Sequence, residues 1–392
     1  MKRSNLFNRA YVALLCINLI VSISFYMLST TITLYATSVG LTTAAAGTVV
    51  GVLSIASLGM RPFTGIISDR LERKRLLIAS LLLISVAMVG CSLTASLTVL
   101  IFFRILHGIG FSMATTITMT LVAGTLPEER MTQGMGYFAI GQTISTAVAP
   151  ALGLLLGEHF GYETTLRTAA ALLILSAMLA AWTVESQPMG TKMHERYAFR
   201  LSDCFAVEAV PYGVLAILVS GCTGIENSFV SLFGQQLHLG SVGWYFTLSA
   251  VALFVARMFG GQFADRNRMA IPLSLGVMAL AFLLLGGVAG YGGAIIFACA
   301  AILKALGLGT VQPALQARSL NSVPEERRGA ASCTYYLGTD IGQAFAPMAG
   351  GVAVQACGYK GMFLLAAVPV ALAAAVVTVL GKNVEKRPDE DE

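Results

Sequence analysis

The sequence predicts an all-α membrane protein of twelve transmembrane helices, arranged as two parallel-repeat bundles of six. The prediction rests on composition, on long apolar segments and on an internal repeat. Of the 392 residues, 56% are hydrophobic and only 11% are charged, whereas a soluble domain carries about 25% charged residues. So few charged residues cannot cover a water-facing surface of this size. We therefore expect lipid, rather than water, to surround much of the chain. The apolar runs do not alternate with polar residues, which favours helices over a membrane barrel.

Charged clusters and turn residues divide the chain into twelve apolar segments. Each is long enough to cross the hydrocarbon core, which takes about 20 helical residues. The first segment is too long for the apolar region of a signal peptide, which has about 7–15 residues. The predicted spans are 10–38, 43–68, 75–94, 97–125, 130–158, 163–184, 207–235, 240–264, 270–289, 294–321, 327–356 and 359–381.

The distribution of basic residues predicts that both termini are cytoplasmic. With this orientation, most of the 25 Lys and Arg residues fall in inside loops and tails, and the outside loops hold only Arg167 and Lys360, as expected from the positive-inside rule. The one long polar break, 186–206, predicts a cytoplasmic linker. It separates an N-terminal bundle over 1–185 from a C-terminal bundle over 207–392 that ends in a short acidic tail. We therefore expect a multi-pass protein of the cell (inner) membrane.

Three motifs recur in the second half at an offset of 196 or 197 residues, which indicates an internal repeat. Because six helices separate the copies, they lie on the same side of the membrane. Such parallel repeats place a substrate site near the midplane, between the halves. The repeated motifs are Arg61-x-Phe63-x-Gly65-x-x-x-Asp69-Arg70 with Arg257-x-Phe259-x-Gly261-x-x-x-Asp265-Arg266, Pro127-Glu128-Glu129-Arg130 with Pro324-Glu325-Glu326-Arg327, and Ala149-Pro150-x-x-Gly153 with Ala346-Pro347-x-x-Gly350.

Three segments carry a resemblance to a known family. Residues 65–75, GIISDRLERKR, resemble motif A of the major facilitator superfamily, and residues 104–110, RILHGIG, resemble its motif B, with His107 where Gln is commoner. Residues 141–153 resemble the motif C of drug/proton antiporters through Gly141, Pro150 and Gly153, although Ala149 precedes the proline. The resemblance covers the whole chain, and the motif sequences are most similar to those of bacterial drug and metabolite exporters. It implies the major facilitator fold.

The motif A resemblance implies a gate at the cytoplasmic side. It places Asp69 against the N-terminus of helix eleven, near Gly329, where a partly buried carboxylate gains up to about 1–2 kcal/mol. This contact would hold the cytoplasmic gate closed. The alternative is that the basic residues only set the topology. The residues assigned to the gate are Gly65, Asp69, Arg70, Arg73, Asp265 and Arg266.

Polar residues inside the predicted helices indicate a substrate cavity, because charged groups at membrane depth are costly. Arg104 and His107 lie on one face of helix four, although Arg104 could instead hold backbone carbonyls. Polar residues of helix one share a face too, but could simply bond neighbouring helices, at about 0.6 kcal/mol per bond. The residues assigned to the cavity are Asn18, Tyr26, Arg104, His107, Asn227, Gln312 and Tyr336.

Proton coupling is assigned to three charged residues of the second half, namely Glu226, Lys304 and Asp340. A low-dielectric site favours the neutral form of a carboxyl group, so such a group can load and release protons. We expect Asp340 to pair with Lys304, and Glu226 to have no partner and to carry the proton. The two carboxylates could also exchange these roles.

The chain contains none of the common nucleotide-binding or hydrolase motifs and no metal-ligand spacing of Cys and His. We therefore expect no enzyme activity, cofactor, metal or nucleic acid. The leading hypothesis is a monomeric proton-coupled exporter of a small organic molecule, of which a metallophore exporter is a narrower version. One alternative is proton symport of an anionic metabolite held by Arg104 and Lys304. Another is a membrane sensor or scaffold that transports nothing.

Overall fold

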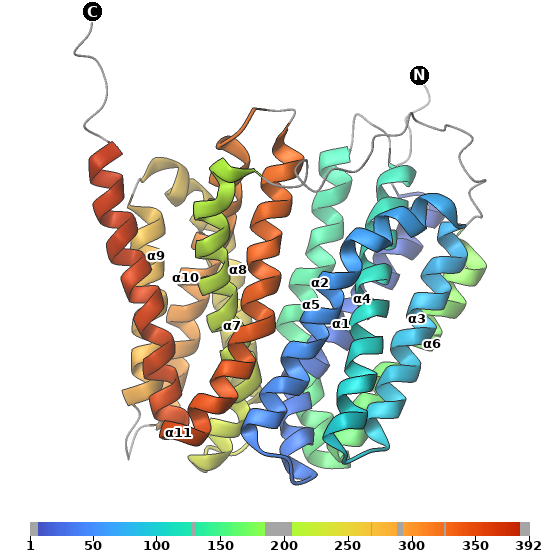
Figure 1. The fold of residues 1–392 in the computed structure, drawn as a ribbon, viewed down its shortest axis with the longest axis horizontal. Coiled ribbons are helices and arrows are strands. Elements are labelled where there is room, and N and C mark those ends of the chain that lie inside the picture. Colours follow the sequence, from blue (N-terminus) through green and yellow to red (C-terminus); the bar gives the residue numbers. More distant parts are fainter. Residues whose placement is uncertain are drawn as a thin grey trace, which may run out of the picture. The chain divides into compact units, whose positions relative to one another are not determined.

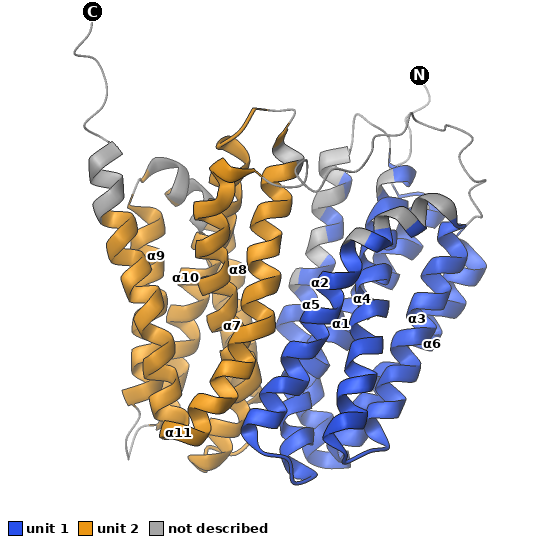
Figure 2. Cartoon of the chain, viewed as in Figure 1, with its two compact units in different colours: residues 1–198 blue, residues 199–392 orange. Residues whose placement is uncertain are grey.

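The structure is a computed structural model that describes residues 7–126, 131–184, 206–267, 269–287, 293–324 and 327–384. Every regular element among these residues is a helix, so the predicted fold class is confirmed. The chain forms two compact units, unit 1 over residues 1–198 and unit 2 over residues 199–392 (Figure 2). The boundary falls in the predicted linker, which lies outside the described residues except for Ala206.

The described residues of unit 1 form six helices, whose limits differ from the predicted spans by at most two residues. Local sequence explains two of the starts. The side chains of Asn8 and Thr42 accept hydrogen bonds from the backbone N–H of Tyr11 and Ala45, which caps α1 and α2. The helices are α1 (Arg9–Ser38), α2 (Thr43–Arg70), α3 (Arg73–Ser92), α4 (Leu97–Thr125), α5 (Met131–Phe160) and α6 (Tyr162–Thr183) (Figure 1).

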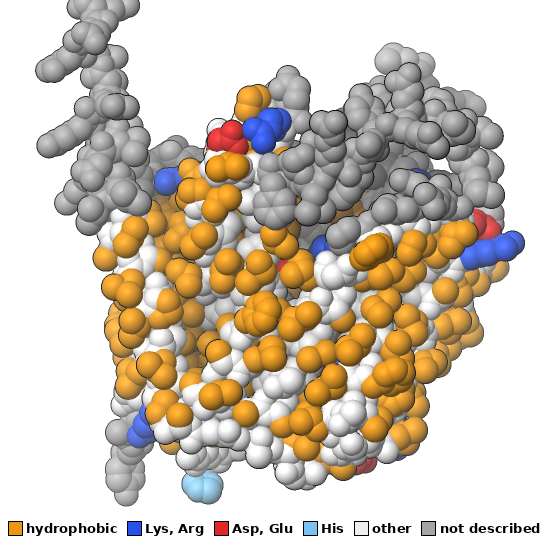
Figure 3. All heavy atoms as spheres, in the orientation of Figure 1, with side chains coloured by type: hydrophobic (Ala, Val, Ile, Leu, Met, Phe, Trp, Pro, Cys, Tyr) orange, Lys and Arg blue, Asp and Glu red, His pale blue; other side chains and the backbone are white. Residues whose placement is uncertain are grey.

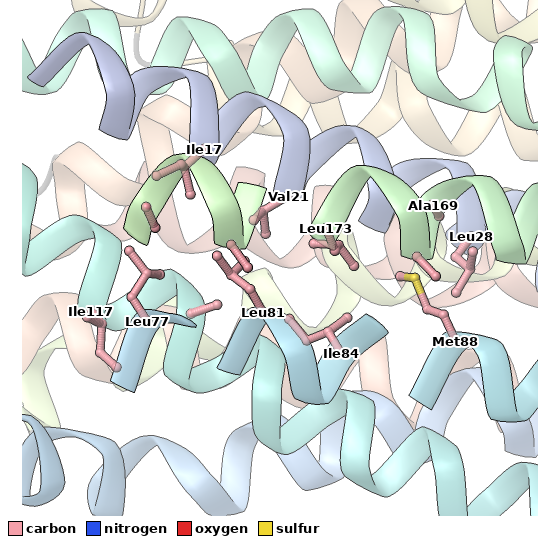
Figure 4. Close-up of a cluster of buried hydrophobic side chains, with 14 of the residues drawn as sticks. Ile17, Val21, Leu28, Leu77, Leu81, Ile84, Met88, Ile117, Ala169 and Leu173 are labelled. Carbon is pink, nitrogen blue, oxygen red and sulfur yellow. The ribbon is translucent and has the colours of Figure 1, made fainter. Parts of the chain in front are cut away.

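The core of unit 1 lies where α1, α3 and α6 meet. Ile17 and Leu28 of α1, Leu81 and Met88 of α3 and Leu173 of α6 point toward one another and are almost fully buried (Figure 4). Burying an aliphatic side chain of this size stabilises the fold by about 1.5–3 kcal/mol. This packing fixes the rotation of α1, and therefore fixes which of its polar residues face α5.

In the described part of unit 2, the first element is the short 3-10 helix η3 (Val207–Ala209). Five longer elements follow it and contain the six predicted spans. The last element, α11, has 57 residues and joins two helices at Gly358, whose φ is 71°. Glycine adopts this left-handed conformation without steric cost, so the predicted break between helices eleven and twelve is confirmed. The other helices are α7 (Val210–Gln236), α8 (Gly243–Arg266), α9 (Ala270–Gly287) and α10 (Gly293–Asn321), and α11 spans Arg328–Val384 (Figure 1).

Helix α7 and the first part of α11 run parallel in close contact. A Cβ atom added at Gly338 would meet the backbone of Gly213, and one at Gly342 would meet the backbone of Ile217, so only glycine permits this approach. The hydroxyl of Ser220 also donates a hydrogen bond of 2.9 Å to the carbonyl of Thr339. These contacts fix the register of the two helices.

The described residues include nine segments long and apolar enough to cross a membrane, one of which, Ala330–Thr378, covers two predicted spans. Hydrophobic side chains cover most of the described surface in Figure 3, and charged side chains are few on this face. A soluble protein does not expose apolar patches of this extent. The protein is therefore a membrane protein with many spans.

Candidate proton and substrate site

Three buried side chains of unit 2 form a polar cluster, which we call the Glu226 cluster: Glu226 of α7, Tyr245 of α8 and Lys304 of α10. Oε2 of Glu226 lies 2.9 Å from Nζ of Lys304, and Oε1 accepts a hydrogen bond of 2.8 Å from the hydroxyl of Tyr245. The three residues are 1%, 0% and 7% exposed. An ion pair that is both hydrogen-bonded and shielded from water is tolerated in an apolar environment.

The helices bring these residues together from positions far apart in the chain. Glu226 lies ten residues before the last residue of α7, and Lys304 lies eleven residues after the first residue of α10. At 1.5 Å per residue, both are about 15 Å from those helix ends. Helices α7 and α8 each pack against α10 in unit 2 (Figure 1), which makes the three-way contact possible.

Aromatic rings hold Tyr245 in place. Its ring meets that of Phe297 edge-on at 5.8 Å, and Phe297 in turn contacts Phe233 at 5.5 Å. Phe233 stacks with Tyr359 at 5.7 Å. These rings come from α7, α8, α10 and α11, so the ring of Tyr245 packs against Phe297, which further aromatic rings hold in place.

The structure corrects the predicted pairing of the charged residues. Glu226 was expected to have no partner, but it contacts both Lys304 and Tyr245. Lys304 was assigned to Asp340, but its ion pair is with Glu226. The register explains the error, because Gly350 of α11 lies beside Ile225. Asp340 precedes Gly350 by ten residues, which is about 15 Å along the helix.

Tyr245 was not predicted as a site residue. It belongs to the run Trp244-Tyr245-Phe246 at the start of α8, and such aromatic runs are typical of the membrane–water interface. Its hydroxyl reaches a residue 19 positions earlier in the chain. No periodicity within one helix could have revealed a contact between two helices.

The other cavity residues predicted in unit 2 lie on α7, α10 and α11. The hydroxyl of Tyr336, which is 46% exposed, accepts a hydrogen bond of 2.8 Å from Nε2 of Gln316. The backbone carbonyl of Gln312 accepts one from the hydroxyl of Tyr335 at 3.3 Å. Asn227 follows Glu226 and is half-buried. Of this set, Tyr336 is therefore open to the surroundings, and its partner Gln316 was not among the predicted residues.

In unit 1, Arg104 and His107 form a second buried polar pair. Nε of Arg104 donates a hydrogen bond of 2.9 Å to the carbonyl of Val49 on α2, and Nη1 lies 3.3 Å from Nδ1 of His107. The two side chains are 3% and 1% exposed. The guanidinium thus links α4 to a backbone carbonyl of α2. This is the structural role that was the alternative to a cavity role in the sequence analysis.

Helices α1 and α5 are joined through the predicted helix-one and motif C residues. Nδ2 of Asn18 donates a hydrogen bond of 3.1 Å to the carbonyl of Phe138, so this residue bonds neighbouring helices. Tyr26 lies half-buried on the same helix. A Cβ atom at Gly153 would lie 2.9 Å from the carbonyl oxygen of Met27, which explains the glycine.

The remaining motif C residues, Gly141 and Pro150, also lie on α5, in the contact region between α1 and α5 that we call the seam. The carbonyl of Gly141 accepts a hydrogen bond of 2.8 Å from the hydroxyl of Ser145, and Pro150 lies inside α5. A proline inside a helix removes one backbone hydrogen bond and favours a bend. The seam between α1 and α5 is therefore closely packed and carries one point of lower helical stability.

The predicted gate lies at the ends of α2 and α8. The backbone of Gly65, Asp69 and Arg70 belongs to α2, and that of Asp265 and Arg266 to α8, but their side chains lie outside the described residues. Gly329 is the second residue of α11, and its surroundings are not described. Arg73 begins α3. The proposed contact of Asp69 with helix eleven therefore stays a prediction.

Comparison with known proteins identifies the family. The sequence profile of the Major Facilitator Superfamily matches residues 14–335 and 212–392, which together cover nearly the whole chain. The chain belongs to the major facilitator superfamily. Membership of this family indicates a membrane transporter rather than an enzyme. Among the described residues, no group of three or more His, Cys, Asp or Glu could hold a metal ion.

Relatives within the superfamily include efflux pumps. The chain is 26% identical over 193 residues to the multi-drug resistance efflux pump PmrA of Streptococcus pneumoniae serotype 4, and this match covers 49% of this chain and 45% of PmrA. It is 25% identical over 204 residues to the putative multidrug resistance protein MdtD of Yersinia pestis, covering 51% and 43%. The chain therefore matches somewhat less than half the length of these curated relatives.

A solved major facilitator structure has the same fold. A bacterial homologue of the human lysosomal transporter Spinster, solved in an inward-facing and unoccupied conformation, superposes with a TM-score of 0.78 at 17% sequence identity. The alignment covers 97% of this chain and 99% of that one. At this identity the comparison confirms the major facilitator fold and carries no information on substrate.

Proposed function

We propose that this protein is a proton-coupled transporter that exports a small organic molecule across the cell (inner) membrane, and that Glu226 takes up and releases the proton. The observation that carries the proposal is the ion pair of 2.9 Å between Glu226 and Lys304, buried among apolar helices. Ionisable groups at membrane depth are rare and are usually functional. Export is supported by the similarity to one protein named as a multi-drug resistance efflux pump and to another named as a putative multidrug resistance protein.

The orientation places Glu226 nearer the outside. With cytoplasmic termini, as the distribution of basic residues predicts, α7 runs outward and ends at Gln236. Glu226 then lies about 15 Å below the outer end of the helix, under the aromatic layer around Tyr245. Opening of this end would give the carboxyl group access to external protons.

Protonation of Glu226 would change the free energy of the buried ion pair by enough to alter the conformational equilibrium. Removing one partner of a buried ion pair costs about 3–5 kcal/mol, because the other charge stays buried. Reversing a two-state ratio from 1:99 to 99:1 takes about 5.5 kcal/mol. Uptake of one proton by Glu226 therefore supplies most of the free energy that is needed to favour a state in which Lys304 is hydrated or finds another partner.

The substrate would occupy a site near the midplane and reach alternate sides as the two halves rock, the arrangement common to such repeats. Asn18, Tyr26 and Tyr336 remain candidates for its lining. Asp69 would stabilise the closed cytoplasmic gate. Because proton and substrate act on one equilibrium, each changes the affinity for the other by the same factor.

The test uses purified protein in liposomes with an imposed pH gradient. A panel of amphipathic fluorescent dyes identifies a transported probe, and the same vesicles are then used for counterflow without a gradient. Glu226→Gln is expected to keep counterflow and to lose accumulation driven by the pH gradient. Glu158→Gln, which removes an exposed carboxylate at the end of α5, is the matched control and is expected to keep both.

Two outcomes would reject parts of the proposal. Intact pH-driven accumulation in Glu226→Gln would show that another group carries the proton. Accumulation of the probe on the acidic side of a pH gradient identifies exchange for protons, and therefore export. Accumulation on the alkaline side indicates symport and would reject export.

A further inference from the structure

The Glu226 cluster is electrically balanced only while Glu226 is ionised. Its carboxylate and the ammonium of Lys304 are in contact, and the phenol of Tyr245 adds a neutral donor. The thiol of Cys222, one turn before Glu226 on α7, is buried as well. Helix α9, which packs against α10, has no titratable residue. The part of α11 beside Ile225 contributes Gly350, and Asp340 lies ten residues, about 15 Å of helix, before Gly350. On α8, Arg257 lies twelve residues, about 18 Å of helix, after Tyr245.

A proton on Glu226 therefore leaves one positive charge in a buried site. The neutral carboxyl group no longer compensates Lys304, whose side chain is 8% exposed. Cys222 and Tyr245 are neutral near physiological pH and cannot replace the lost charge. A buried ammonium without a counter-charge is strongly unfavourable, so an anion at Lys304 would stabilise the protonated state.

We propose that Lys304 forms a binding site for a small anion, and that this site becomes available when Glu226 is protonated. The ligand class is a monovalent anion, either an organic carboxylate or an inorganic ion. The inference rests on the proposed role of Glu226 as the proton acceptor. Its consequence is that the proton and the anionic group occupy unit 2 together, and that each increases the affinity for the other.

Two sources can supply this anion. A carboxylate of the transported molecule would move with the proton in one direction, which is symport and would replace the proposed export. An inorganic anion such as chloride would instead accompany the proton, while the organic molecule is exchanged against both. The two sources share the same chemistry at Lys304, so one experiment with two anions distinguishes them.

The experiment measures thermal unfolding of the purified 392-residue chain as each anion replaces sulfate at constant ionic strength. Sulfate is divalent and therefore lies outside the proposed ligand class. Chloride and benzoate are the two probes. Glu226→Gln mimics the protonated carboxyl group and leaves Lys304 charged. It is expected to be stabilised saturably by at least one probe near pH 8, with a half-saturating concentration about tenfold or more below that of the wild type.

Two variants identify Lys304 as the site. Glu226→Gln combined with Lys304→Met removes both charges and should lose the anion response. Glu226→Gln combined with Lys360→Met removes an exposed lysine elsewhere in unit 2 and should keep it. If Glu226→Gln does not fold, the wild type provides the test, because its half-saturating concentration should fall between about pH 8 and pH 5, and Lys304→Met should abolish this dependence.

The outcomes are distinct. Saturation by chloride supports an accompanying inorganic ion, and saturation by benzoate alone supports an acidic group on the transported molecule. A Glu226→Gln protein that responds to neither probe, or a response that survives Lys304→Met, would overturn the proposal. This equilibrium test needs no transport, so it can fail while Glu226 still carries the proton, and vesicle transport can reject Glu226 while Lys304 still binds anions.

Discussion

The ion pair of Glu226 and Lys304 predicts a large and non-additive effect on stability. Glu226→Gln leaves a buried ammonium and Lys304→Met leaves a buried carboxylate, so each single substitution should cost about 3–5 kcal/mol. The double variant removes both charges and keeps the acceptor for Tyr245, so it should lie within about 1 kcal/mol of the wild type, since a buried pair can often be replaced without loss. The coupling between the two sites is therefore several kcal/mol.

Thermal unfolding of the purified wild type, the two single variants and the double variant measures this coupling as a double-mutant cycle. For a unit of about 200 residues, 1 kcal/mol changes Tm by roughly 2–4 °C, so each single variant should melt about 6–20 °C below the wild type. The double variant should recover most of the lost Tm.

An exposed ion pair in the same unit serves as the matched control. Nη1 of Arg327 lies 3.0 Å from Oε1 of Glu208, with the two side chains 46% and 48% exposed. The distance is close to that of the buried pair, but water screens these charges. The cycle of Glu208→Gln and Arg327→Met should show little coupling. Additive Tm changes for the Glu226 and Lys304 variants would refute the argument from burial.

Three further predictions concern the hydroxyl of Tyr245, the packing of α1 against α5 and the cytoplasmic gate. Tyr245→Phe removes a hydrogen-bond donor to the carboxylate of Glu226, worth about 1.5–3 kcal/mol, so the pH profile of vesicle transport should move to higher pH, whereas Tyr359→Phe should leave it unchanged. Gly153→Ala forces a methyl group against a backbone carbonyl of α1 and should cost about 1–3 kcal/mol in thermal unfolding, whereas Gly59→Ala, which meets open space, should not. Asp69→Asn should strongly reduce vesicle transport at normal expression, and wild-type rates in the purified variant would reject the gate.

The fold could be predicted nearly completely from the sequence, because the bilayer imposes one length and one polarity on every span. The predicted spans and the observed helices differ by at most three residues at their ends, and the break at Gly358 was placed correctly. Glycine, proline and charged clusters mark these boundaries locally. No knowledge of neighbouring helices is needed to find them.

The pairing of charged residues could not be predicted in the same way. Glu226, Lys304 and Asp340 were each recognised as intramembrane charges, but their partners depend on how α7, α10 and α11 are rotated and shifted against one another. The glycine contacts between α7 and α11 fix that register. The sequence shows where the glycines are, but it does not show which residues of the neighbouring helix they contact. The role of Tyr245 was missed for the same reason.

The most direct test of the central claim is infrared difference spectroscopy of the carboxyl groups during a pH titration of the purified protein. The account predicts a C=O stretching band of a protonated carboxyl group that grows as pH falls, is absent from Glu226→Gln and persists in Asp340→Asn. A band that is retained in Glu226→Gln and lost only in Asp340→Asn would contradict the claim and would assign the proton to Asp340.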